Sequence, residues 1–147
     1  MDKTIEVEDR RMLLDIFKNL DMATWSIDII DDEINDDDFL ELVKSEKKAY
    51  EEIKLETMKL ADKQDIDLKN INMMAKMGSF TSIKFSTFFD NSNSNIANRL
   101  IQGTAMGIIQ IRKAQNSYKN ISPEIKELAE KLYSVENKFF KNLQKFL

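Results

Sequence analysis

The sequence predicts an all-α protein in which four long helices form an antiparallel bundle and a shorter fifth helix lies between the second and the third. Two observations support this prediction. The chain of 147 residues contains only 3 Gly and 1 Pro, too few for the many tight turns of an all-β protein. Its apolar residues recur at three- and four-residue steps over long stretches, as in helices that bury one face. A chain of this length suits one domain, so we expect a single bundle over residues 1–147.

The first helix is expected over residues 8–33 and the second over residues 37–63. The apolar stripe of the first comprises Leu13, Ile16, Phe17, Leu20, Thr24, Ile27 and Ile30. Asp36 or Asp37 is suited to cap the second helix, because a carboxylate there accepts hydrogen bonds from free backbone N–H groups. The stripe of the second helix includes Glu46. So short a connection predicts that the two helices form an antiparallel hairpin.

Residues 64–91 are expected to form a long crossover that contains a shorter helix over residues 68–90. The segment is too apolar for a solvated linker. Its Met and Phe side chains are the candidate interface, because such side chains are common where another chain docks. These candidates are Met74, Met77, Phe80, Phe85, Phe88 and Phe89. The alternative is that they cap the core of their own bundle.

The third helix is expected over residues 93–118 and the fourth over residues 123–146. Ser122 and Pro123 form a start signal for the fourth helix, since Ser is a common N-cap and Pro suits the first helical position. A second hairpin therefore follows the crossover.

Gly103 and Gly107 lie four residues apart in the third helix, in phase with its apolar stripe. Each glycine costs a helix about 0.5–1 kcal/mol relative to Ala, so a gain elsewhere should offset them. We expect a neighbouring helix to pack closely there. The alternative is a pocket for a ligand or for a bulky neighbour such as Trp25.

Charge differs between the two halves of the chain. Residues 1–67 contain 21 acidic and 10 basic side chains, whereas residues 68–147 contain 5 and 12. This asymmetry predicts that an acidic hairpin packs against a basic one, within the chain or across a dimer. The net charge of −4 and the spread of Lys and Arg around the helices argue against a nucleic-acid partner.

The chain contains no Cys and no His. Disulfides, thiol nucleophiles, zinc sites built on Cys or His and Ser-His-Asp catalysis are therefore excluded. No basic segment followed by an apolar core opens the sequence, and no apolar run approaches the ~20 residues that span a bilayer. We expect a cytoplasmic protein with no membrane segment.

Two hairpins joined by a long crossover resemble the ferritin-like four-helix bundle. In that superfamily each hairpin contributes a Glu and a Glu-x-x-His to a two-metal site. Asp21 and Glu46 lie near the ligand positions of the first hairpin, but Ala49 replaces the His.

In the second hairpin Gln102 falls at the position of the first Glu, Glu136 takes that of the second, and Phe139 replaces the His. The chain is similar to uncharacterised bacterial members of the superfamily that lack a complete di-iron site. The resemblance implies at most three carboxylate ligands, Asp21, Glu46 and Glu136. Such a set suits Mg²⁺, Mn²⁺ or Ca²⁺ and is poor for iron and oxygen chemistry.

Two other interpretations of Glu46 and Glu136 stay open. The side chains could lie at the edge of the stripe and be solvated. They could also belong to a buried polar network in which Gln102 and Thr104 donate hydrogen bonds to the carboxylates, with a Lys or Arg as counter-charge.

We therefore expect a non-catalytic helical-bundle protein with a structural or protein-interaction role, associated as a homodimer or with another protein. No cofactor is predicted. The alternatives are a divalent-metal protein that uses carboxylates alone, and a small-molecule binder with its site beside Trp25, Gly103 and Gly107.

Overall fold

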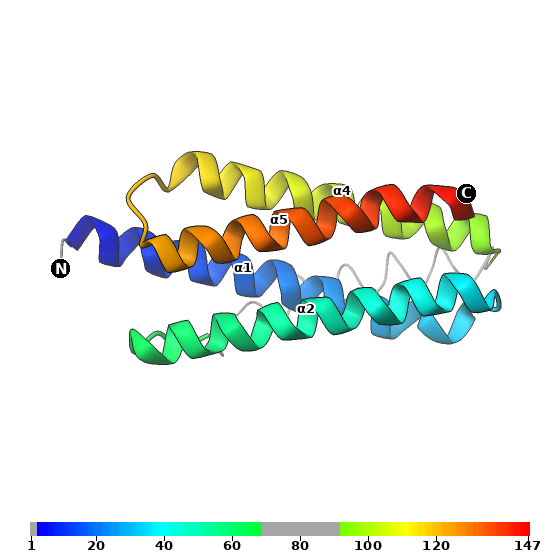
Figure 1. Cartoon of the computed structure of the whole chain (residues 1–147), viewed down its shortest axis with the longest axis horizontal. Helices are drawn as coiled ribbons and strands as arrows, with labels where there is room; N and C mark the ends of the chain where they lie inside the picture. The colour runs from blue at the N-terminus through cyan, green and yellow to red at the C-terminus, as the bar shows by residue number, and fades with distance from the viewer. Residues whose placement is uncertain (1–2, 69–91) are drawn as a thin grey trace.

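The structure, a computed structural model, describes residues 3–68 and 92–147. Four long helices lie side by side in an elongated bundle, which confirms the predicted four-helix, all-α fold over these residues (Figure 1). They are α1 (Lys3–Ile30), α2 (Asp37–Lys63), α4 (Asn93–Ser117) and α5 (Pro123–Leu143), with 3₁₀ turns η1 (Asp31–Glu33) and η2 (Gln144–Phe146). The helix predicted over residues 68–90 lies outside the described residues, as do the interface candidates within it.

The helix ends follow the predicted caps in part. Asp36 caps α2, since its Oδ1 accepts a hydrogen bond of 2.9 Å from the Phe39 N–H. Ser92 caps α4 in the same way through the Asn95 N–H, at 3.2 Å. The prediction for Ser122 was only half right: α5 begins at Pro123 as expected, but the Ser122 side chain makes no capping hydrogen bond.

The four helices form a square in which α1 packs against α2 and α4, and α5 packs against the same two helices. Every neighbouring pair is antiparallel, whereas α2 and α4 run in the same direction across the diagonal (Figure 1). The acidic and the basic hairpin therefore pack against each other within one chain. Lys131 of α5 pairs with Glu56 of α2 across this contact, at 2.8 Å.

Aromatic side chains join α2 to the last helix along the core. Tyr50 meets Phe139 edge to face, with ring centroids 6.4 Å apart. Phe39 stacks on Phe146 of η2 at 4.5 Å. Among the described helices, none combines the length and the apolarity that crossing a membrane requires.

A buried carboxylate that the sequence analysis did not single out ties α1 to the start of α5. Asp9 is fully buried, and its Oδ1 accepts a hydrogen bond of 2.7 Å from the Ser122 N–H. Its Oδ2 accepts from the Ser122 hydroxyl and, at 3.4 Å, from the Gln64 amide. Next to it, Glu8 accepts from the Asn120 N–H. The contact with Asp9 explains why the Ser122 hydroxyl does not cap its own helix. α1 begins at Lys3, before residue 8, where we predicted its start.

Candidate functional site

Two glutamates lie in the core where α2 packs against α5. Glu46 and Glu136, here called the carboxyl pair, occupy stripe positions of these helices and are 9% and 1% exposed. The expectation that they are solvated at the edge of the stripe is therefore wrong. Glu46 Oε1 and Glu136 Oε2 are buried without a hydrogen-bond partner among the described residues. Burying a polar oxygen without a hydrogen bond lowers the stability of the fold, so these two side chains call for an explanation other than packing.

Gly107 provides the space for one of these carboxyls. A Cβ atom at position 107 would lie 2.9 Å from Glu136 Oε1 and 3.0 Å from Oε2, closer than real Cβ contacts. The backbone oxygen of Gly107 also accepts a hydrogen bond of 3.0 Å from Asn19 Nδ2. Because Asn19 belongs to α1, each of the four long helices contributes to the surroundings of the carboxyl pair.

Tyr50 closes the site on the α2 side. Its side chain is 2% exposed, and its hydroxyl hydrogen-bonds to the Glu46 carboxyl one turn before it. Burial raises the pKa of Tyr50 well above 10, and the carboxyl pair raises it further. The hydroxyl therefore remains a neutral donor at physiological pH.

The pKa values of the carboxyl pair are far from those of ordinary glutamates. Burial, and to a smaller extent the nearby Glu46 carboxyl, together raise the pKa of Glu136 from 4.5 to about 8. Burial also raises the pKa of Glu46 from 4.5 to about 8, although Lys138 and the Tyr50 hydrogen bond act in the opposite direction. Both shifts favour the protonated form, so the pair binds protons at pH values where a solvated glutamate is ionised.

Asp21, the third predicted ligand, is not part of this site. Its Oδ1 pairs with Lys54 Nζ at 2.8 Å, between α1 and α2. Lys54 follows Glu46 by eight residues, or ~12 Å along α2. The structure thus brings together two of the three predicted carboxylates, and α1 supplies Asn19 in place of the third. Asn19 is in phase with the buried Met12 and Ile16, the signal that could have identified it.

The predicted core polar residues of α4 have other roles. Gln102 is exposed and donates to Asn98 Oδ1 of its own helix at 3.1 Å, so its placement in the core was wrong. Thr104 is buried, but its hydroxyl donates to the Leu100 oxygen at 2.6 Å rather than to a carboxylate.

The predicted pocket beside Trp25 is not what the structure shows around the two glycines. Gly103 is exposed, and no atom of the described residues lies within 4 Å of a Cβ built on it. Close packing was therefore a wrong prediction for Gly103, whereas Gly107 lies against the Glu136 carboxyl. Trp25 is partly buried and packs against the hydrophobic core.

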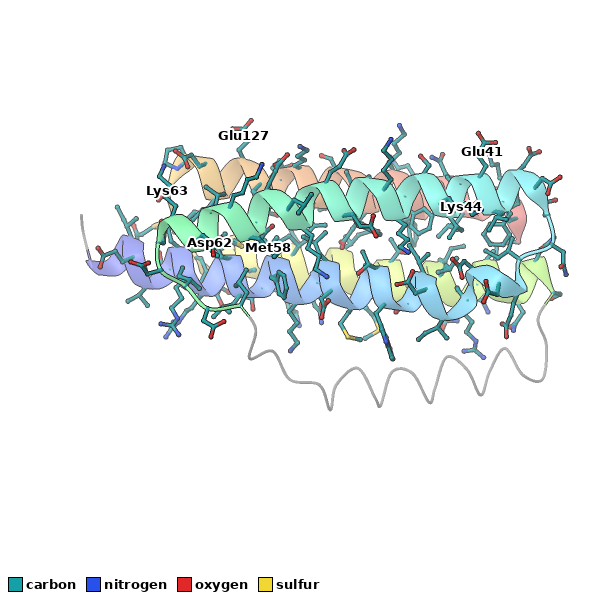
Figure 2. All side chains as sticks on the ribbon, turned by 90° about the horizontal axis from the view of Figure 1, so that it is seen from below. Glu41, Lys44, Met58, Asp62, Lys63 and Glu127 are labelled. Atoms are coloured by element: carbon teal, nitrogen blue, oxygen red, sulfur yellow. The ribbon has the colours of Figure 1, made fainter. Side chains whose placement is uncertain are left out.

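Two shallow grooves lie on the side of the bundle where α2 packs against α5 and η2. One groove is near each end of the bundle. Figure 2 shows this side, with Glu41 close to one end and Glu127 close to the other. One groove is lined by Asp38, Glu41, Leu42, Ser45, Lys145 and Phe146, the other by Glu56, Lys59, Leu60, Glu124, Glu127, Leu128 and Lys131. Neither is lined by a member of the carboxyl pair.

The residues present do not fit the two-metal site that a ferritin-like bundle implies. Ala49 and Phe139 stand at the imidazole positions, and Phe139 is buried in the core beside Tyr50. Within the described residues, no three side chains of the types His, Cys, Asp or Glu are grouped so as to hold a metal ion. The space left by Gly107 is taken up by Glu136 itself.

We expect Mn²⁺ at millimolar concentration to leave the melting temperature unchanged, because two carboxylates offer too few ligands to displace the proton they hold. The measurement is a thermal unfolding scan at neutral pH with increasing Mn²⁺, on the natural sequence and on Glu136→Gln. A rise in melting temperature that disappears in Glu136→Gln would restore the metal site.

Compared with models of protein families, with curated proteins and with solved structures, the chain gives no significant match.

Proposed function

We propose that this protein is a non-catalytic helical-bundle module of ferritin-like architecture that associates with a second copy of itself through the outward side of α4. The direction of the helices supports the architecture. α2 ends and α4 begins at opposite ends of the bundle (Figure 1), as in bundles that join two hairpins by one long crossover. The exposed side chains of α4 support the association.

The outward side of α4 presents a stripe centred on Met106, here called the α4 face. Met106 and Ile109 are 64% and 54% exposed, high values for large apolar side chains. The other members of the stripe lie three, four or seven residues from Met106, so they surround it on the helix surface. They are Arg99, Gln102, Gly103, Gln110 and Lys113. No acidic residue occurs between residues 91 and 123, so the α4 face has apolar, amide and basic groups only.

The open position at Gly103 is the observation that carries the proposal. A Cβ there would have nothing within 4 Å among the described residues, so the glycine costs the helix free energy that no described contact at this position offsets. If two α4 helices pair antiparallel about Met106, Ile109 of one copy lies opposite Gly103 of the other. A large side chain then enters the space above a small one, as in close helix contacts. Gln102 lies opposite Gln110 in the same arrangement, where the two amides are able to hydrogen-bond. Arg99 lies opposite Lys113 toward each end of the contact, a like-charge pair that keeps the association weak.

The exposed apolar residues of α2 lie in a different setting. Leu55 and Met58 are 57% and 43% exposed, but charged side chains surround them. Figure 2 shows Met58 on the same side of α2 as Asp62. A dimer through this surface would desolvate several charges, so α2 provides a matched control for the α4 face.

Sedimentation velocity tests the proposal. A contact between single helices is small, so we expect a weak dimer whose mass approaches twice 17.2 kDa only as the concentration rises. Met106→Lys places two ammonium groups at the centre of the contact and should weaken association at least about tenfold. Met58→Lys makes the same change on α2 and should leave association as it was.

Two results would count against the proposal. A species of 17.2 kDa at all concentrations would show that the chain does not self-associate. Equal weakening by Met58→Lys and Met106→Lys would place the contact elsewhere.

A further inference from the structure

The described residues offset the charge of the carboxyl pair only in part, through Lys138 and the Tyr50 hydroxyl, which both act on Glu46. Both side chains are at least nine-tenths buried, and each has an oxygen without a partner among the described residues. Two ionised carboxylates in such a place lose their hydration and repel each other. The ligands required to replace a proton with a metal ion are not grouped there.

We propose that Glu46 and Glu136 hold at least one proton at neutral pH, so that the bundle takes up protons as it folds and loosens at its centre in alkaline solution. A protonated carboxyl becomes a hydrogen-bond donor. Each bound proton therefore removes one buried charge and adds one hydrogen-bond donor beside the orphaned oxygens.

The groups that face the pair from each helix fit this arrangement. On α1 the amide of Asn19 is neutral and already donates to the Gly107 oxygen. On α2 the Tyr50 hydroxyl is neutral. On α4 Gly107 has no side chain, and the Thr104 hydroxyl donates to its own helix. On α5 Lys138 is exposed and acts on Glu46 from a distance. One cation at the surface balances at most one of the two carboxylates.

The direction of the pH dependence follows from the raised pKa values. Both carboxyls have a pKa of about 8 in the folded chain and an ordinary value of 4.5. Below pH 4.5 both states are protonated, and folding is independent of these groups. Between about pH 4.5 and 8 the folded chain binds more protons than the unfolded chain, so stability falls as pH rises. Above about pH 8 the loss is complete.

The composition of the chain makes this window easy to observe. It contains no His and no Cys, and ordinary Asp, Glu, Tyr and Lys side chains titrate below about pH 5 or near pH 10. Any change in the free energy of unfolding between about pH 6 and 8 is therefore expected to come from the carboxyl pair, apart from a contribution of the amino terminus.

Urea unfolding of the full chain at closely spaced pH values between about 6 and 8.5 tests the proposal. For each bound proton, the folding equilibrium constant should fall about tenfold per pH unit until about pH 8. The double variant Glu46→Gln/Glu136→Gln keeps the shape but neither position can ionise, so it should remove this slope. Glu130→Gln is the control, because Glu130 is an exposed α5 glutamate that accepts from Gln115. It should keep the slope.

A carboxyl ¹³C titration by NMR on the natural sequence gives a second readout that does not require a variant to fold. At least one glutamate signal should titrate near pH 8 rather than near 4.5. The proposal is overturned if stability is flat between pH 6 and 8, if the double variant Glu46→Gln/Glu136→Gln keeps the slope, or if every glutamate titrates below about pH 5.5. A slope that Mn²⁺ abolishes would overturn it as well, because the pair would then bind a metal.

Discussion

Replacing Asp9 with Ala is expected to lower the free energy of unfolding by about 3 kcal/mol. Asp9 is fully buried, and the change leaves the Ser122 N–H, the Ser122 hydroxyl and the Gln64 amide without their acceptor. It also removes a negative charge from the N-terminal end of α5, where the helix dipole favours one. Urea unfolding measures the loss. Amide hydrogen exchange should show that the Ser122 N–H loses its protection.

Glu8→Ala is the matched control for this prediction. Glu8 is the neighbouring acid and also accepts from a backbone N–H of the α4–α5 connection, that of Asn120, but at the surface. Its loss should cost no more than about 1 kcal/mol, because water replaces the missing partner. Equal losses in Asp9→Ala and Glu8→Ala would show that burial of the Asp9 contacts does not matter.

Leucine at position 107 and leucine at position 103 should have opposite effects. A side chain at Gly107 would collide with the carboxyl of Glu136, since its Cβ alone lies 2.9 Å from Oε1. Glu136 is 1% exposed and has no room to withdraw, so we expect Gly107→Leu to cost about 3 kcal/mol. The Cβ of Gly103→Leu has no neighbour within 4 Å in the described part of the chain, so this change should stabilise the helix by about 0.5–1 kcal/mol. Urea unfolding at low protein concentration compares the two.

A double-mutant cycle identifies why a side chain at position 107 lowers the free energy of unfolding. If contact with the carboxyl is responsible, Gly107→Ala should be destabilising in the natural chain and stabilising in a Glu136→Ala background. The same sign in both backgrounds would show that the backbone of α4, rather than Glu136, requires the glycine.

Much of the fold could be predicted because it depends on local pattern. The stripe and the cap at Asp36 gave the bounds of α2 as the structure has them. The same pattern placed Glu46 and Glu136 in phase with apolar neighbours. It could not say whether they are buried, since the edge and the centre of a stripe differ by less than one residue in phase.

The wrong predictions for Gly103 and Gln102 on α4 also arise because the sequence pattern does not fix the rotation of a helix closely enough. With 3.6 residues per turn, residues 103 and 104 both follow Leu100 at a spacing that suits one face. The packing of α4 against α1 and α5 buries Thr104 and leaves Gly103 exposed. Gln102 is carried outward by the same rotation. A shift of one position on a helix is a turn of about 100°, enough to move a side chain from the core to the surface.

By itself the sequence determined the helical class, the four long helices, the cap of α2 and the buried stripes of α1 and α2, because these depend on residues within a few turns of one another. Only the tertiary structure decided which polar groups meet. Asp9 and Ser122 are 113 residues apart in the chain, and the carboxyl pair joins helices from different hairpins. Contacts at such a distance depend on the rotation of each helix about its axis, which is set by the packing of all four.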